Sequence, residues 1–466
     1  MRESTKTGAL LLIAALAAGS VLLLRAPAFL TGDSGFRTLL VVSLAIFTLT
    51  EYRRAMLPVV VIGFLWAGLD VPYQETAYAG RWAVLAMAAL FGLIVWSRSP
   101  YKLDFGAVHL LAAFTVLSTL FSALGAVNRQ LALLKCLSIF LLFLYLSIGG
   151  RVTFQGKEAS TVHGVMKVCQ WLVLLCAVLY LVDLPYWYNP NSLGGIMGMF
   201  AWPFVLWGYL IARSVQERRY AGFVVLVCAT LLLLSRARAG MLAAGLSSMI
   251  ILFSLRRIRL ISLATLGLIV FFLAFFLIAP DNFHDYTQTV IYKPNETDRE
   301  LSLLSSRRSP WEKTIKTIQE HPWFGTGLGT PEKSVEGIFT TGGYREHGNS
   351  YLTVAEGLGL LGVAPFALLL VVLLHRVQMA CAWMRRNNNP AHCAIPLVWV
   401  MLAGLVHAMF EDWLLSAGSY FCVGFWIITF WALDLTNRKA FSSVPTPVAV
   451  DLRSQSSPQA QPSWVR

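Results

Sequence analysis

Long apolar runs separated by short polar connections repeat along most of the chain. A helix needs about 20 apolar residues to cross a hydrocarbon core of roughly 30 Å. Segments that reach or approach this length are 8–30, 36–51, 55–71, 81–98, 105–127, 130–149, 163–184, 192–212, 220–234, 240–254, 260–279, 351–374, 394–410 and 417–435. Because some are short enough to be tilted or broken, the pattern predicts an all-α polytopic membrane protein with about 12–14 transmembrane helices.

The composition supports a membrane environment and excludes several functions. Hydrophobic residues make up 57% of the 466 residues and charged residues only 13%. The net charge of +13 comes from short basic runs between apolar segments, so retention of loops in the cytoplasm explains it better than binding to nucleic acid. Cysteine and histidine spacings show no zinc motif and no disulfide framework, and we expect no metal and no cofactor.

The distribution of Lys and Arg predicts the orientation in a bacterial inner membrane. With a cytoplasmic N-terminus, alternate loops carry the positive charge. This divides the chain into an N-terminal transmembrane bundle of about 11 spans (1–280), a periplasmic loop (281–350), C-terminal spans (351–438) and a disordered cytoplasmic tail (439–466). Residues 1–28 are interpreted as the first span rather than a signal peptide. The long loop and the turns 235–239 and 411–416 then face the periplasm together.

The long loop contains the pattern of a short amphipathic helix. Ser309 and Glu312 have the spacing of a capping box, and Pro310 suits the first helical position, so the helix is predicted to start at Ser309 and to end at His321-Pro322. Trp311, Ile315 and Ile318 would lie on one face.

Two arginine pairs are candidate anion ligands on this outer side. Arg236 and Arg238 stand between two apolar spans, where they either bind an anion or anchor a helix end. Arg307 and Arg308 precede the predicted loop helix, whose N-terminus would also favour an anion, or they are solvated loop residues.

Other outer-face groups could take part in proton transfer. They are His347, Asn349 and Glu356 at the loop-to-span boundary, and His407, Glu411 and Asp412 near the end of a later span. Each of these could equally be an interface or cap residue. The glycines at 325, 327 and 329 follow a helix rather than a strand, so we expect a flexible turn and not a nucleotide-binding loop.

Several motifs together resemble the O-antigen ligase and polymerase superfamily of bacterial envelope glycosyltransferases. They are Ser235 to Ala239 at a span start, Arg307-x-x-x-Trp311, His321-Pro-x-x-Gly-x-Gly327, His347-Gly-Asn-Ser-Tyr-Leu352 and Glu356-Gly-Leu-Gly359. Gly348 separates a histidine and an asparagine that are usually adjacent in the family. Phe410-Glu411-x-Trp413 is similar to members associated with exopolysaccharide assembly.

The resemblance implies a GT-C-like fold and transfer of a glycan from undecaprenyl diphosphate to an acceptor hydroxyl, without nucleotide sugar or metal. It implies that Arg236, Arg238, Arg307 and Arg308 bind the diphosphate, and Arg-Ala-Gly after position 237 favours Arg238 over Arg236. It further implies that His347 accepts the acceptor's proton, that Glu411 or Glu356 orients the acceptor or the histidine, and that Asn349 helps to orient the acceptor.

Three functions fit these residues. The first is a metal-independent, inverting glycosyltransferase that polymerises O-antigen or exopolysaccharide repeat units, with ligation of the finished chain to lipid A-core as its alternative. The expected partners are the lipid-linked donor, a glycan or lipid A-core acceptor, membrane lipid and polysaccharide-assembly proteins. The second is a lipid-linked oligosaccharide flippase or other transporter, disfavoured because ionisable residues within spans are few (His109, Lys167). The third is a scaffold without activity.

Overall fold

The computed structural model describes residues 56–68, 74–99, 103–126, 128–182, 190–291, 305–329 and 348–436. The predictions for segments 8–30 and 36–51, for His347 and for the tail 439–466 lie outside these residues. Within the described ranges the chain forms helices and no strand, and seven helices are long and apolar enough to cross a membrane. The predicted all-α polytopic fold is confirmed.

Each predicted span from 55–71 onward corresponds to one helix or to helical segments joined end to end. The elements in chain order are α4 (Met56–Gly68), α5 (Gln74–Ser97), α6 (Ala107–Gly125), α7 (Arg129–Tyr145), the π-helical η2 (Leu146–Gly150), α8 (Arg151–Phe154), α9 (Glu158–Leu181), α10 (Pro190–Gly195), the π-helical η4 (Ile196–Ala201), α11 (Trp202–Ile211), α12 (Val215–Leu234), α13 (Arg238–Ser254), α14 (Ile258–Ile278), α15 (Pro280–Ile291), α16 (Ser305–Glu320), α17 (Ser350–Asn387), α18 (Ala394–His407) and α19 (Tyr420–Thr436).

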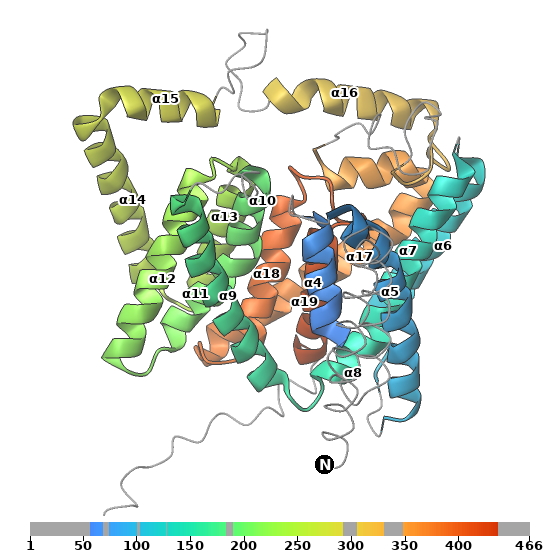
Figure 1. Cartoon of the computed structure of the whole chain (residues 1–466), viewed down its shortest axis with the longest axis horizontal. Helices are drawn as coiled ribbons and strands as arrows, with labels where there is room; N and C mark the ends of the chain where they lie inside the picture. Colours follow the sequence, from blue (N-terminus) through green and yellow to red (C-terminus); the bar gives the residue numbers. More distant parts are fainter. Residues whose placement is uncertain are drawn as a thin grey trace, which may run out of the picture.

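Helix α18 lies at the centre of the bundle. All of its residues are buried, as expected for a helix that is apolar all round, and it carries no Asp, Glu, Lys or Arg. It packs against α13 and α11, while α19 packs against α18, α4 and η2. Figure 1 shows α18 and α19 between the green helices α9–α13 and the blue and teal helices α4–α8. These two helices therefore join the two sides of the bundle.

Helix α17 is longer than the predicted span 351–374 and continues to Asn387. Its final turns keep an apolar stripe, because Val377, Ala380, Cys381 and Met384 are buried at helical spacing while the opposite face is polar. Averaging hydropathy along the sequence detects only stretches that are apolar on all faces. The predicted span therefore ended at residue 374, where one face of α17 becomes polar.

Two helices of the predicted outer loop lie across one end of the bundle (Figure 1). The first is α15, which follows α14, a helix without any buried residue. The second is α16, which packs on α17. Helix α8 lies at the opposite end. An amphipathic helix in the loop is confirmed.

The predicted start of this loop helix was wrong. Helix α16 begins at Ser305, with Pro310 inside it, and Arg307 and Arg308 belong to its first turn rather than to the chain before it. Glu312 pairs with Arg308 one turn earlier, at 2.9 Å between Arg308 Nε and Glu312 Oε1, instead of capping Ser309. Pro310 is the sixth residue of the helix, so its missing N–H leaves one i−4 backbone hydrogen bond unmade.

The buried face of α16 also differs from the predicted one. Thr314 and Thr317 are buried, Trp311 and Ile318 are half-buried, and Ile315 is 45% exposed. Both threonine hydroxyls donate to backbone carbonyls of the same helix, at 2.9 and 3.1 Å. These bonds satisfy the hydroxyls, so small threonine side chains can face the neighbouring helix in place of isoleucine.

A buried ion pair closes the opposite end of the bundle. Arg151 is 2% exposed and donates from Nε and Nη2 to both carboxylate oxygens of Asp434 at 2.6–2.9 Å. It also donates to the carbonyl of Asp104 at 2.9 Å and contacts His109 Nε2 at 3.0 Å. His109 stands at the start of α6, not in mid-span. This pair links α8, α6 and α19.

We predict that Asp434→Asn lowers the free energy of unfolding by about 3 kcal/mol, because Arg151 would remain buried without its counter-charge. Thermal unfolding of the purified protein in detergent measures this effect. The matched control is Asp104→Asn, since the Asp104 side chain is exposed and only its carbonyl accepts from Arg151. Equal melting temperatures for the Asp434→Asn variant and wild type would contradict the prediction.

Candidate active site

The start of α17 is fixed by its own cap and by the turn that follows α18. The Asn349 side-chain oxygen accepts from the amides of Tyr351 and Leu352, at 2.9 and 3.2 Å, which is a standard N-cap. Ser350 Oγ donates to the carbonyl of Glu411 at 2.6 Å and accepts from the amides of Trp413 and Leu414. Ser350 therefore ties the Glu411 turn to α17. Sequence reasoning did not single it out.

Arg307 and Glu411 meet beside this junction. Arg307 Nη2 lies 3.2 Å from Glu411 Oε1, and both side chains are about one-fifth exposed, at 20% and 21%. The pair joins α16 to the turn after α18, although its partners are 104 positions apart in sequence. Two predicted site residues are thus brought together, and the side chains of both remain partly exposed at the protein surface.

Gly348 packs directly against the Arg307 guanidinium. Its φ is +58°, a left-handed value that favours glycine, and a Cβ built on it would collide with Arg307 Nη1. The residue that departs from the family's usual His-Asn pattern therefore has a steric reason here. Its neighbour His347 lies outside the described residues.

Residues 321–329 after α16, called the glycine segment below, are an ordered part of the site. Amides of Thr326 and Gly327 donate to the carbonyls of Glu356 and Gly357, each at 3.0 Å, and amides of Leu360 and Leu361 donate back to the carbonyls of Pro322 and Trp323, at 2.7 and 3.3 Å. We predicted a flexible turn, and Gly325, Gly327 and Gly329 do have the positive φ values of turn residues. The segment is nevertheless hydrogen-bonded to α17 along its backbone.

This docking requires a break in α17 at Gly359, where φ is 62° and ψ is −176°. A Cβ at Gly359 would lie 2.5 Å from the carbonyl of Trp323, and one at Gly325 would lie 2.5 Å from the carbonyl of Glu356. The glycines thus allow two backbones to touch and pair. Glu356 lies at this junction with a buried side chain.

The two arginines before α13 have different surroundings. Arg236 has a left-handed φ of 53°, is exposed, and lies 5.8 Å from the centre of the Tyr286 ring of α15. Arg238 is the first residue of α13 and is half-buried. Gly194 of α10 packs against Ala237 between them. The turn and α15 therefore lie at the same end of the bundle as α16, as expected.

The surroundings of Arg308 and His407 do not favour the roles considered from sequence, which were anion binding and proton transfer. Arg308 is on the outer face of α16, where it and Glu312 are 69% and 64% exposed. His407 is 2% exposed, and its Nδ1 accepts from the indole N–H of Trp413 at 2.9 Å. A ring nitrogen engaged in this way cannot also accept a proton, so His407 supports the packing below Glu411.

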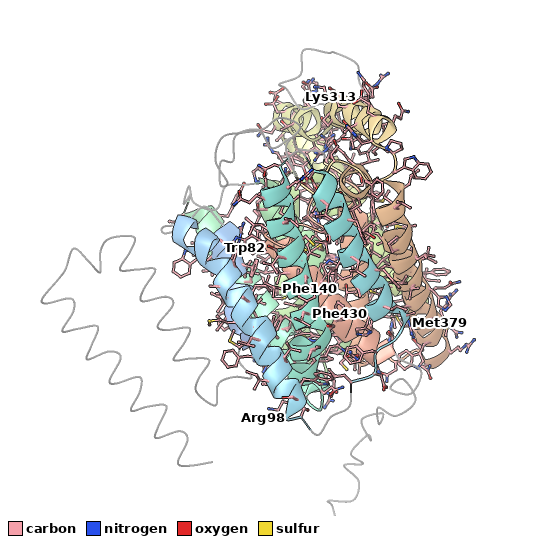
Figure 2. The ribbon with its side chains drawn as sticks, turned by 90° about the vertical axis from the view of Figure 1, so that its right-hand side faces the viewer. Trp82, Arg98, Phe140, Lys313, Met379 and Phe430 are labelled. Atoms are coloured by element: carbon pink, nitrogen blue, oxygen red, sulfur yellow. The ribbon has the colours of Figure 1, made fainter. Side chains whose placement is uncertain are left out.

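Two further cations lie at this end that sequence reasoning did not assign to the site. Arg81 of α5 is 5% exposed, stacks on Trp82 and donates to the carbonyl of Gly418 at 3.3 Å. Lys135 of α7 donates to the carbonyl of Gly329. Its charge is attracted by Asp412 and repelled by Arg81. Figure 2 shows Trp82 on the part of α5 nearer α16 and Arg98 at the other end.

The sequence contained one signal that could have pointed to Lys135, because it is a lysine inside an apolar helix. Lys135 stands in Arg129-Gln-Leu-Ala-Leu-Leu-Lys-Cys, within a predicted span, and an ionisable residue there calls for a named partner. Arg81 gave no such signal, because arginine at a span start is ordinary.

We predict that Gly359→Ala lowers the free energy of unfolding by about 2 kcal/mol or more, since alanine disfavours the positive φ and its Cβ meets the docked segment. Gly267→Ala in α14 is the matched control, as its Cβ would meet nothing within 4 Å. It should be neutral or slightly stabilising. Thermal unfolding of both variants compares them, and similar losses in both would remove the argument for the docking.

Residues 222–367 match a family model described as O-antigen ligase. The matched range includes the turn 235–239 with Arg236 and Arg238, α16, the glycine segment and the start of α17. No curated protein matches the chain. The family match supports the O-antigen ligase and polymerase superfamily that the sequence motifs resemble, and with the apolar helices it indicates a multi-pass bacterial membrane protein.

Proposed function

We propose that this chain, a glycosyltransferase of the O-antigen ligase and polymerase type by its match over residues 222–367, moves a glycan from undecaprenyl diphosphate to an acceptor hydroxyl. The observation that carries the proposal is the accessible Arg307–Glu411 pair held at the start of α17. Arg238 begins α13 at the same end of the bundle. An anionic diphosphate is the group that such fixed guanidinium groups recognise.

The reaction that fits these groups is a single displacement at the anomeric carbon. The bond from this carbon to the diphosphate oxygen breaks, and its electron pair leaves with undecaprenyl diphosphate. The acceptor oxygen bonds to the carbon from the opposite face, and the hydroxyl proton passes to His347. Arg307 and Arg238 stabilise the charge that develops on the leaving group, which is the role a metal ion would otherwise fill.

The contacts refine the roles of the other candidates. Glu411 is a positioning residue, because its carboxylate holds the Arg307 guanidinium. Asn349 uses its side-chain oxygen to cap α17 and so holds the neighbouring chain rather than the acceptor. The Glu356 side chain is buried near the break in α17, and its backbone carbonyl accepts from the Thr326 amide of the docked segment. Arg236 and Arg308 are exposed and contribute less to binding the donor.

The distribution of charge supports a periplasmic position for this site. The opposite end of the bundle carries most of the exposed cations in the described part of the chain, and the positive-inside rule places such an end in the cytoplasm. These cations include Arg98, Arg213, Arg218, Arg219, Arg256, Arg257, Arg259, Arg385 and Arg386.

Polymerisation of repeat units is the preferred form of the reaction, supported by Phe410-Glu411-x-Trp413. The description of the matched family, O-antigen ligase, favours ligation to lipid A-core as the second candidate. Both use the same donor, so only the acceptor separates them.

We expect Arg307→Lys to lower the rate of glycan transfer about 10²-fold, because lysine keeps the charge but loses the planar fork. Arg308→Lys is the matched control at the next position and should retain activity, since its side chain lies on the exposed face. Rates are measured with purified variants at equal amounts of folded protein. Equal activity of the two variants would reduce Arg307 to a surface charge.

Purified protein incubated with a carrier-linked repeat unit should produce longer carrier-linked glycans, resolved by size. Product formed only with lipid A-core as acceptor would instead identify a ligase. Activity should persist in EDTA and fall by about 10²- to 10⁴-fold in His347→Ala. Strict dependence on added Mg²⁺, or normal transfer by His347→Ala, would overturn the mechanism.

A further inference from the structure

The end of the bundle opposite α16 carries an arginine pocket that the proposed function does not use. Its arginines come from two turns, and we define the arginine pocket as Arg213, Arg218 and Arg219 beside the start of α12 together with Arg256, Arg257 and Arg259 beside the start of α14. Two adjoining hollows form it. Arg218 and Tyr209 line both, so the two hollows share one wall.

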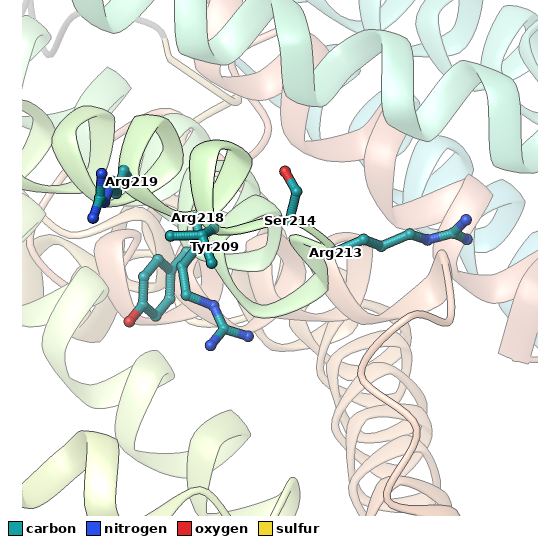
Figure 3. A pocket seen from close by; sticks show the side chains of 6 residues that line it. Tyr209, Arg213, Ser214, Arg218 and Arg219 are labelled. Atoms are coloured by element: carbon teal, nitrogen blue, oxygen red, sulfur yellow. The ribbon is translucent and has the colours of Figure 1, made fainter.

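The first hollow is an open site at the α11–α12 turn, lined by Tyr209, Arg213, Ser214, Val215, Arg218 and Arg219. Figure 3 shows Arg218 next to the Tyr209 ring, with Arg219 on one side and Arg213 and Ser214 on the other. The second hollow adds Arg256, Arg257 and Arg259 from the α13–α14 turn. That turn is held by hydrogen bonds from the Arg256 and Arg257 amides to the carbonyls of Phe253 and Leu252, at 3.0 and 2.8 Å.

Charge in the pocket is almost entirely positive. None of the ion pairs among the described residues involves its six arginines. The carboxylate of Glu217, in the first turn of α12, accepts from the amides of Arg213 and Ser214, at 2.8 and 3.3 Å, and these bonds, together with the charge of Arg213, lower its pKa. Glu217 is thus engaged mainly in the cap of α12, and no carboxylate in the described part of the chain forms an ion pair with the six guanidinium groups, which can therefore bind an anion.

Apolar side chains directly beside the pocket face outward. Phe223 of α12 is 56% exposed, and Ile258 and Leu263 of α14 are 56% and 63% exposed. Helix α14 has no buried residue, so its whole surface is open to lipid. Cations at the helix ends with apolar surface along the same helices match a phospholipid, whose phosphate and acyl chains are joined in that order. A soluble anion would use only the cations.

We propose that the arginine pocket binds the two phosphates of a diphosphatidyl phospholipid, cardiolipin, in the leaflet opposite α16. Each hollow would take one phosphate, and Arg218 would contact both. The acyl chains would lie along α12 and α14. Binding of this lipid would tie α14, which packs weakly on the bundle, to the α11–α12 turn.

The test uses the full chain purified into neutral detergent and titrated with cardiolipin, phosphatidylglycerol, phosphatidylcholine or inorganic pyrophosphate. Cardiolipin should raise the melting temperature by about 5 °C and remain bound in native mass spectrometry. Arg218→Gln and Arg257→Gln should each weaken the lipid's affinity about tenfold or more. Arg98→Gln, an exposed arginine at the same end but outside the pocket, is the matched control and should bind as wild type.

Four results would overturn the proposal. They are an unchanged cardiolipin shift in both Arg218→Gln and Arg257→Gln, an equal loss in Arg98→Gln, an equal shift with phosphatidylcholine, or full reproduction of the shift by pyrophosphate. Because the readout is lipid binding to unmodified or pocket-variant protein, failure here leaves the proposed transferase activity untouched.

Discussion

The backbone contact between residues 321–329 and the break in α17 determines where the candidate site can form. Inside a membrane protein an unpaired amide or carbonyl costs several kcal/mol, so a helix can break at depth only where another segment supplies partners. Here the glycine segment supplies them through four backbone hydrogen bonds. This fixes the end of α16 over α17, and the position of α16 in turn places Arg307 beside Glu411.

Two arginine–carboxylate pairs show how surroundings separate a structural pair from a candidate catalytic one. Arg151 is almost fully buried, and it donates to Asp434, to Ser147 and to Asp104 while its remaining side faces His109, so a ligand cannot reach it. Arg307 makes one contact with Glu411 at 3.2 Å and remains one-fifth exposed. The first pair holds helices together. The second holds a guanidinium in place and, among the residues that the structure describes, engages only one of its donors, so other donors can face phosphate oxygens.

The two ends of the bundle organise their cations differently. At the α16 end, cations stand next to carboxylates and backbone carbonyls, as Lys135 does with Gly329 and Asp412, which restricts their positions. Catalysis needs that restriction, because charge stabilisation depends on donors already in place. Among the described residues, the side chains of the arginine pocket form no ion pair, and they lie at the ends of lipid-facing helices, an arrangement that suits a variable, flexible headgroup.

The sequence by itself determined the membrane class, the spans from 55–71 onward, an amphipathic loop helix and the resemblance to the O-antigen ligase and polymerase superfamily, because these depend on local hydrophobic periodicity and on short motifs. It also selected Arg307 and Glu411 as candidates. Only the tertiary structure decided that these two pair, that α16 begins at Ser305, that the glycine segment docks on α17, that Ser350 ties the Glu411 turn to α17, and that Arg81 and Lys135 donate to backbone carbonyls at the same end. Contacts between segments far apart in the chain depend on packing and on backbone approach, and no local pattern of residues encodes them.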